Sequence, residues 1–137
     1  DGAVAGAIGF YGYYGPAGEA ASGVPISPHD CLSPDAPPVM IVHGALDTLV
    51  PATMASEFAD QLARVSTAPV VYAELPGTQH NFDFFHSLRY HVIADAAQAF
   101  ADWATRSTAS TAAATCGSPS AQPPRAVMNR HERQEGG

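Results

Sequence analysis

The chain has 137 residues, 46% of them hydrophobic, which is enough to form a core, and its formal net charge at pH 7 is −7. Its six basic residues are all arginines and form no basic patch, so we expect no nucleic-acid partner. No apolar run approaches the roughly 20 residues of a membrane-spanning helix, so we expect no membrane span.

The first residue bears on whether the chain is part of a longer protein, and the cysteines bear on its redox compartment. The chain begins with Asp1 instead of an initiator methionine and opens at once on an apolar stretch, so we expect part of a longer protein. Its two cysteines, Cys31 and Cys116, show neither metal-ligand spacing nor a disulfide framework. They leave the redox compartment open, and we take the cytoplasm as the default location.

The first 38 residues divide into a strand and a long irregular segment. Residues 4–14 mix aromatic and β-branched side chains with glycines, which predicts one strand that has either a close backbone approach or a bulge. Residues 15–38 are rich in Gly, Ala, Ser and Pro, and such long excursions often form the lid or wall of a site. Its His29-Asp30 pair could serve catalysis, but a solvated turn before Cys31 is the favoured interpretation.

The next four segments alternate between strand and helix patterns. The apolar run Val39–Val42 predicts a buried central strand, and apolar residues spaced by three and four predict a helix over Ala52–Val65. A second strand follows over Val70–Leu75, and a terminal helix extends from about Ser87 to Ala104. Strands that alternate with helices imply parallel pairing through right-handed crossovers, so the predicted class is an open α/β sheet.

The last 31 residues, 107–137, differ from the rest of the chain in their low content of large apolar side chains. Residues 107–137 contain almost no large apolar side chain beyond Val127 and Met128, so they cannot bury enough surface to offset the entropy of ordering. We therefore expect a folded region over 1–106 and a disordered tail over 107–137.

Two candidate catalytic side chains follow the two predicted strands. Asp47 comes shortly after the run 39–42, and His80 comes after a Pro-Gly turn that ends the run 70–75. Because the carboxyl ends of parallel strands meet at one edge of a sheet, we expect Asp47 and His80 to face each other. A carboxylate on one ring nitrogen fixes the tautomer and stabilises the imidazolium formed when the other nitrogen takes a proton. The pair is typical of the acid and base of a hydrolytic triad.

Two other histidines could compete with His80 for the role of base. His43 stands at the end of the first apolar run, where packing under the following loop is the simpler interpretation. His86 lies at the entry to the terminal helix, beside Ser87, whereas His80 follows a turn that comes straight off a strand. Because a base must be held rigidly against its partner, we favour His80.

The loop after His80 also carries an acid and three phenylalanines. Asp83 could be a rival acid, but its position three residues after His80 is better suited to anchoring the loop. We expect Phe82, Phe84 and Phe85 to be core or pocket wall, where they could exclude water from the base.

These residues carry a resemblance to a known family. The stretch from Pro37 to Trp103 resembles the C-terminal part of an α/β-hydrolase serine esterase, of the kind related to hormone-sensitive lipase and bacterial carboxylesterases. The matching text is HGALDTLVP, then a helix, then VVYAELPGTQHNFDFFHSLR, then a helix ending AQAFADW. The resemblance implies the C-terminal half of an α/β-hydrolase sheet. In that family the triad runs Ser, acid, His along the chain, and Asp47 before His80 obeys that order.

The nucleophile of that family has no counterpart in these residues. No G-x-S-x-G elbow occurs, and Ser22 lies in AASG inside a loop, without the strained strand-to-helix turn that exposes a nucleophilic serine. The oxyanion donors of the family would also lie upstream. We therefore expect a fragment that lacks the nucleophile and is inactive on its own.

The function that the resemblance implies is hydrolysis of carboxylic esters through an acyl-enzyme. His80 would deprotonate the serine and then protonate the leaving alcohol, while Asp47 holds His80 in register. The partner is a small-molecule ester, no metal or organic cofactor is implied, and the oligomeric state is open. Two alternatives remain: a serine peptidase of the prolyl-oligopeptidase type, and a noncatalytic α/β-hydrolase-like binding module that lacks the serine.

Overall fold

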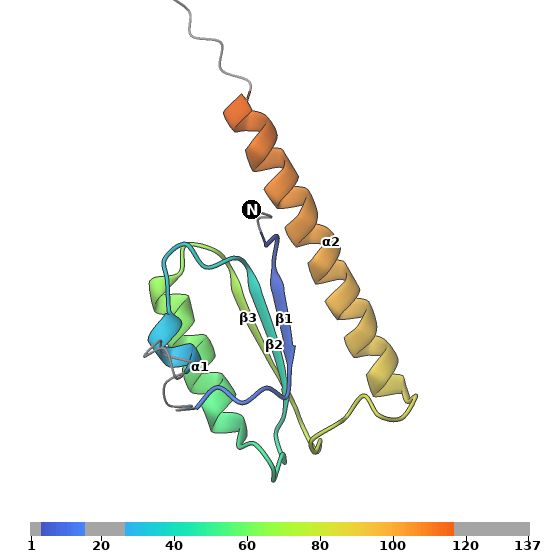
Figure 1. Cartoon of the computed structure of the whole chain (residues 1–137). Coiled ribbons are helices and arrows are strands. Elements are labelled where there is room, and N and C mark those ends of the chain that lie inside the picture. Colours follow the sequence, from blue (N-terminus) through green and yellow to red (C-terminus); the bar gives the residue numbers. More distant parts are fainter. Residues whose placement is uncertain (1–3, 16–26, 117–137) are drawn as a thin grey trace, which may run out of the picture.

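The computed structural model describes residues 4–15 and 27–116. Three parallel strands form one sheet in the order β1-β2-β3, and the two α-helices lie on its opposite faces (Figure 1). This arrangement confirms the predicted α/β class. The elements in chain order are β1 (Ala7–Phe10), the 3-10 helix η1 (Pro28–Cys31), β2 (Val39–Gly44), α1 (Ala52–Val65), β3 (Val70–Leu75) and α2 (Leu88–Cys116).

Strand β2 is the centre of the sheet, as its sequence predicts. It pairs in parallel with β1 and β3, in registers that place Val42 beside Phe10 and Ala73. Because both faces of a central parallel strand are covered, its side chains form a continuous apolar run instead of an alternating pattern. Met40 and Val42 pack on the face that α2 covers, and Ile41 packs on the face that α1 covers.

Helix α1 has the bounds that the apolar spacing predicts, and it packs on the sheet through small side chains. Ala55 and Ala59 are buried against Ile41, and a small residue at these positions lets the helix approach the strands closely. Pro51 directly precedes the helix, where a missing backbone N–H is harmless because the first N–H groups have no helical partner.

Helix α2 covers the second face of the sheet. Ile93 is buried in a cluster with Met40 and Val42, and Phe100 packs against the same cluster. The helix begins at Leu88, one residue after the predicted start. Ile93 and Phe100 therefore help to form the second layer that covers this face of the sheet.

The C-terminal end of α2 differs from the prediction. The helix continues to Cys116 instead of ending near Ala104, so residues 107–116 are helical where we expected a disordered chain. This stretch holds Ala, Ser, Thr and Cys but neither Gly nor Pro, and a helix that is already nucleated can extend through such residues. The rest of the predicted tail, 117–137, lies outside the described residues.

Strand β1 is shorter than the predicted segment 4–14, and the irregular segment after it is only partly described. Tyr11 has a φ of 39°, so the extended backbone ends after Phe10. Within the predicted excursion, residues 27–38 are described, and they include the turn of η1. His29 is not simply solvated there, because its Nδ1 lies 2.9 Å from Oε1 of Gln61 on α1.

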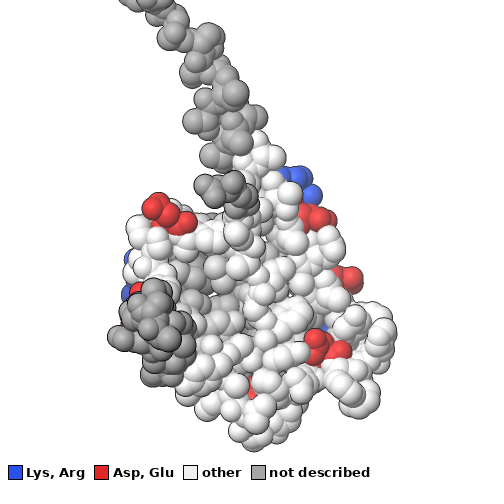
Figure 2. All heavy atoms as spheres, in the orientation of Figure 1, with Lys and Arg blue, Asp and Glu red and all other residues white. Residues whose placement is uncertain are grey.

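The described surface is weakly charged and exposes several large apolar groups. On the face in Figure 2, acidic side chains are scattered among uncharged atoms and arginines are few. None of the helices within residues 4–15 and 27–116 has both the length and the apolar character needed to cross a bilayer.

Several large apolar side chains of the described residues are exposed to solvent. Exposed apolar groups mark contact surfaces or aggregation hazards when they gather into a patch. They include Val4, Leu49, Phe84, Phe85, Leu88 and Val92.

The loops that leave β2 and β3 are joined by backbone hydrogen bonds. The N–H of Ala45 donates to the carbonyl of Leu75 at 3.0 Å, and that of Leu46 donates to the carbonyl of Thr78 at 2.9 Å. Gly44 lies where these two loops approach each other. A Cβ added to it would be 2.5 Å from the carbonyl oxygen of Thr78 and 2.9 Å from the carbonyl oxygen of Gln79. Only glycine allows the two backbones to approach this closely.

We expect Gly44→Ala to destabilise the protein by about 2–3 kcal/mol, because the methyl group meets backbone that cannot rotate away. Gly77→Ala is the matched control: its φ of 64° disfavours alanine, but nothing lies within 4 Å of an added Cβ. Its cost should be only about 1 kcal/mol. Urea unfolding of the two variants measures both values, and a Gly44→Ala variant as stable as Gly77→Ala would contradict the close approach.

Candidate active site

The loops after β2 and β3 bring Asp47 and His80 together at the carboxyl edge of the sheet. Nδ1 of His80 lies 2.7 Å from Oδ2 of Asp47, a distance typical of a charge-assisted hydrogen bond. The Asp47 side chain is fully buried, whereas that of His80 is 21% exposed. The two residues thus meet as the sequence predicts, with the acid enclosed and the imidazole still accessible.

The Asp47 carboxylate accepts hydrogen bonds on both oxygens. Oδ1 accepts from the backbone N–H groups of Leu49 at 2.9 Å and Val50 at 2.8 Å, and Oδ2 accepts from His80. Burial raises the pKa of Asp47, but the N–H of Val50, the His80 ring and the N–H of Leu49 together outweigh burial, and the net pKa is below the ordinary value of 3.8. The group therefore remains an anion that can stabilise a positive imidazole.

The contact with Asp47 also determines which nitrogen of His80 carries the proton. An ionised carboxylate only accepts hydrogen bonds, so Nδ1 is the donor and Nε2 of the neutral ring holds the lone pair. This tautomer is the one that a general base needs. Nε2 can take a proton from a nucleophile while Asp47 stabilises the resulting charge.

His43 packs under the loop, as expected, and in addition it contacts Asp47. Its side chain is fully buried, with Nε2 2.9 Å from the carbonyl of Val50 and 3.2 Å from Oδ2 of Asp47. Both neighbours are acceptors, so the Nε2 proton lies between them. Nδ1 is buried with no hydrogen-bond partner among the described residues. The i,i+4 spacing of His43 and Asp47 was the sequence signal for this contact, and our sequence reasoning did not use it.

The loop that carries His80 is shaped by two residues with positive φ. Gly77 has a φ of 64°, which confirms the Pro-Gly turn off β3, and Asn81 has a φ of 55° directly after His80. The loop is also tied to its neighbour, because Oε1 of Gln79 accepts from the N–H of Thr48 at 3.3 Å. These contacts place His80 on backbone that the sheet itself positions.

Tyr11 is a member of this site that the sequence analysis missed. It follows β1 directly, and its ring centroid lies 4.5 Å from that of His80. Its hydroxyl donates to Oδ1 of Asp83 at 2.9 Å. Asp83 is therefore hydrogen-bonded to the end of β1 and anchors the His80 loop, as expected. The only sequence signal for Tyr11 was its position at the end of a strand that reaches the same edge of the sheet.

The three phenylalanines of the loop have different surroundings. Phe82 packs against the core, with its ring centroid 5.7 Å from that of Phe10. Phe84 and Phe85 are 74% and 75% exposed, so the expectation that they belong to the core is wrong for the described part of the chain, and a place in a pocket wall stays a prediction. The N–H of Phe84 donates to the carbonyl of Asn81 at 3.1 Å, and this turn carries both side chains outward.

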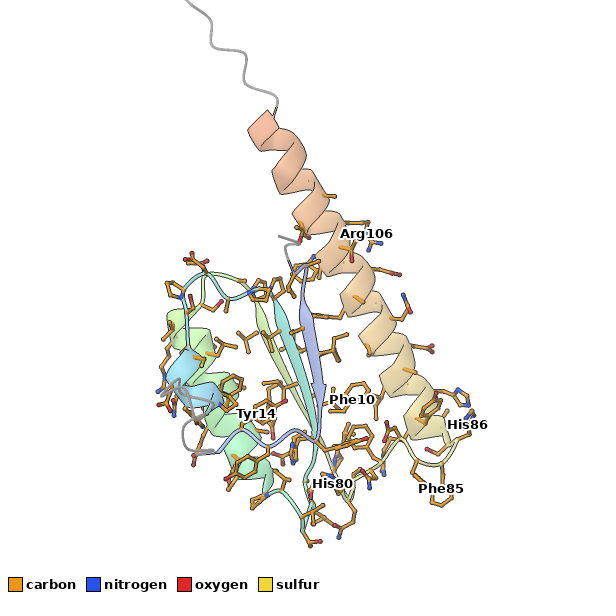
Figure 3. The ribbon with its side chains drawn as sticks, viewed as in Figure 1. Phe10, Tyr14, His80, Phe85, His86 and Arg106 are labelled. Carbon is orange, nitrogen blue, oxygen red and sulfur yellow. The ribbon has the colours of Figure 1, made fainter. Side chains whose placement is uncertain are left out.

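His86 lies apart from the pair formed by Asp47 and His80. Its exposed ring stacks on Tyr90 at a centroid distance of 4.8 Å. Figure 3 shows His80 at the ends of the strands and His86 beside the start of α2. Ser22, which the sequence analysis considered and rejected as a nucleophile, lies outside the described residues.

Comparison with known proteins relates the chain to esterases. It is 56% identical over 63 residues to "Probable carboxylic ester hydrolase LipM" of Mycobacterium tuberculosis, a match that covers 46% of this chain and 15% of that protein. It is 36% identical over 83 residues to the esterase LipC of the same organism, covering 61% of this chain and 21% of LipC. The chain thus spans only a small part of these relatives. No family model matches it.

Solved structures that resemble this chain include esterases. The propionate-bound esterase Est2 of Thermogutta terrifontis has a TM-score of 0.52 at 19% identity, over 78% of this chain and 43% of that protein. The same esterase phosphoramylated by tabun has a TM-score of 0.51 at 21% identity, over 78% of this chain and 41% of that one. Identities this low establish the fold alone. Together with the mycobacterial sequences, they confirm the resemblance to α/β-hydrolase esterases.

Asp47→Asn should change the response of stability to acid. Because the folded-state pKa of Asp47 is lowered, its ionised form favours folding, and this stabilisation is present above the unfolded value near 3.8. It is lost as the pH falls through the folded-state pKa. We therefore expect the free energy of unfolding to fall more steeply for the wild type than for Asp47→Asn between about pH 5 and pH 2.

Urea unfolding at a series of pH values measures this difference. The matched control is Asp60→Asn, because Asp60 is exposed on α1 and its loss should leave the wild-type acid dependence in place. Equal slopes for the wild type and Asp47→Asn would show that the hydrogen bonds to this carboxylate do not favour its ionised form.

Proposed function

We propose that this chain is part of a serine esterase of the α/β-hydrolase fold and that Asp47 and His80 are the acid and base of its triad. The proposal rests above all on the buried Asp47 carboxylate, bonded at 2.7 Å to Nδ1 of a partly exposed His80. Similarity to LipM and LipC supports an ester as the substrate, because both proteins are named as ester-hydrolysing enzymes.

The reaction would proceed through an acyl-enzyme. As a serine hydroxyl outside these 137 residues attacks the carbonyl carbon of the ester, its proton passes to Nε2 of His80. Asp47 stabilises the imidazolium through Nδ1. The tetrahedral intermediate then collapses, and the departing alkoxide takes the proton from Nε2. Water then attacks the acyl carbon while Nε2 of His80 takes a proton from it. The second tetrahedral intermediate collapses, the serine oxygen takes that proton back, and the carboxylic acid is released.

The proposal also covers the ligand, the partners and the cellular location of the enzyme. We propose a small-molecule ester as the ligand and no nucleic-acid partner, given a formal net charge of −7 and few arginines. A cytoplasmic location stays a prediction.

An esterase is favoured over a peptidase because the named relatives are esterases. It is favoured over a binding module because the hydrogen bond to Asp47 gives His80 the tautomer that proton transfer needs.

In the complete protein, His80→Ala should lower kcat for a short p-nitrophenyl ester by about a thousandfold or more, since no other group would accept the serine proton. Asp47→Asn should rank second in severity because it loses control of the tautomer. His86→Ala is the matched control and should cost much less, because His86 is exposed beside α2. If the His86 variant is inactive and the His80 variant turns over normally, the assignment of the base is wrong.

The isolated 137-residue chain should not hydrolyse p-nitrophenyl esters and should resist labelling by a fluorophosphonate. Catalysis needs an activated serine and oxyanion donors, and one such donor alone contributes about a hundredfold or more. The complete protein should be labelled at one serine outside these residues. Stoichiometric labelling of the isolated chain at Ser22, or at any other of its serines, would contradict the proposed position of the nucleophile.

A further inference from the structure

Backbone strain in the described part of the chain is concentrated around His80. Tyr11 and Asn81, with φ values of 39° and 55°, are the only residues other than glycine that have positive φ within residues 4–15 and 27–116. Asn81 follows His80 directly, and the ring of Tyr11 lies against the imidazole. A tyrosine with positive φ is strained, and the conformation persists only where its surroundings enforce it. Such strain often marks a site where geometry serves function.

Two hydrogen bonds hold Tyr11 in this conformation. Its backbone N–H donates to the carbonyl of Val42 at 2.9 Å, which continues the contact between β1 and β2 past the end of the strand. Its hydroxyl donates to Oδ1 of Asp83 at 2.9 Å. Tyr11 therefore connects the end of β1 to the loop that carries His80, and the two hydrogen bonds offset the strain at its backbone.

The tyrosine ring covers one side of the imidazole. The centroids of Tyr11 and His80 are 4.5 Å apart with the planes inclined at 56°, and Phe82 meets the Tyr11 ring edge-on at 5.3 Å. The bond to Asp47 restrains only Nδ1, so the ring could still swing about that contact. A wall of aromatic carbon beside the imidazole limits this swing and keeps Nε2 at one position.

We propose that Tyr11 and Asp83 form a brace that positions His80 for proton transfer, an inference that rests on the proposed esterase function. Tyr11 is a positioning residue, since it acts through the imidazole and not on the substrate. Partial burial, together with the hydrogen bond and charge of Asp83, raises the pKa of the Tyr11 hydroxyl above 10.0. The hydroxyl therefore remains a donor to Asp83 throughout the pH range in which an esterase works.

Kinetics of the complete protein test the brace. Tyr11→Leu removes both the ring and the hydroxyl, and we expect kcat to fall about tenfold to a hundredfold with KM little changed, because a displaced base slows chemistry. Tyr11→Phe keeps the ring and should recover most of kcat. Asp83→Ala should cost as much as Tyr11→Phe, and the double variant should be no worse than either, since both break the same bond. Additive losses, or an unchanged kcat in Tyr11→Leu, would overturn the proposal.

The matched control is Tyr72→Phe. This change also removes a bond from a tyrosine hydroxyl to a carboxylate, here to Oε2 of Glu74 at 2.8 Å, but at a position within β3 that lies before the His80 loop. Its kcat should equal that of the wild type. A loss as large as that of Tyr11→Phe would show that such bonds act through general stability, which would overturn a specific role for Tyr11.

A spectroscopic readout separates this inference from the proposed function. The ring current of Tyr11 should displace the imidazole proton resonances of His80 in the complete protein, and the displacement should persist in Tyr11→Phe and disappear in Tyr11→Leu. If the wild-type protein hydrolyses no ester, the proposed function has failed. These resonances then show by themselves whether the Tyr11 ring holds the His80 imidazole in place. His80 resonances that are the same in the wild type and Tyr11→Leu would show that Tyr11 does not position the ring.

Discussion

The functional end of the sheet depends on the carboxylate of Asp47. One of its oxygens binds two N–H groups of its own loop, and the other binds His80 from the next loop, so one buried group joins both loops. A buried carboxylate without donors would cost several kcal/mol. The loops therefore cannot separate without removing one of the donors to this buried charge. The interaction that would stabilise a protonated His80 during catalysis also stabilises the local fold.

Each of the three strand ends contributes one residue to this edge of the sheet. β1 is followed by Tyr11, β2 by Asp47 and β3 by His80, and parallel pairing brings the three ends to the same side. Gly44 then permits the last approach between the second and third loops. A site built in this way derives its rigidity from the sheet, which would suit the base proposed for His80, because a base must stay within a fraction of an ångström of its partners.

Much of the fold could be predicted because its signals are local. The apolar run of β2, the three- and four-residue spacing in α1 and the Pro-Gly turn before His80 depend only on nearby residues, and all three were predicted correctly. The late end of α2 was missed because Ala, Ser and Thr neither stop a helix nor show an apolar period. The exposure of Phe84 and Phe85 was missed because an irregular loop has no periodicity from which a direction can be inferred.

The sequence by itself determined that two parallel strands end in an acid and a histidine, because the apolar runs and the chain order place Asp47 and His80 at one edge. The tertiary structure decided which atoms meet, namely Nδ1 of His80 and Oδ2 of Asp47, and that Tyr11 lies against the same imidazole. The physical reason is that the Tyr11 contacts join a strand end to a loop 72 residues later, at Asp83. No local pattern encodes such a contact, since it exists only when separate strands pair and their loops pack together.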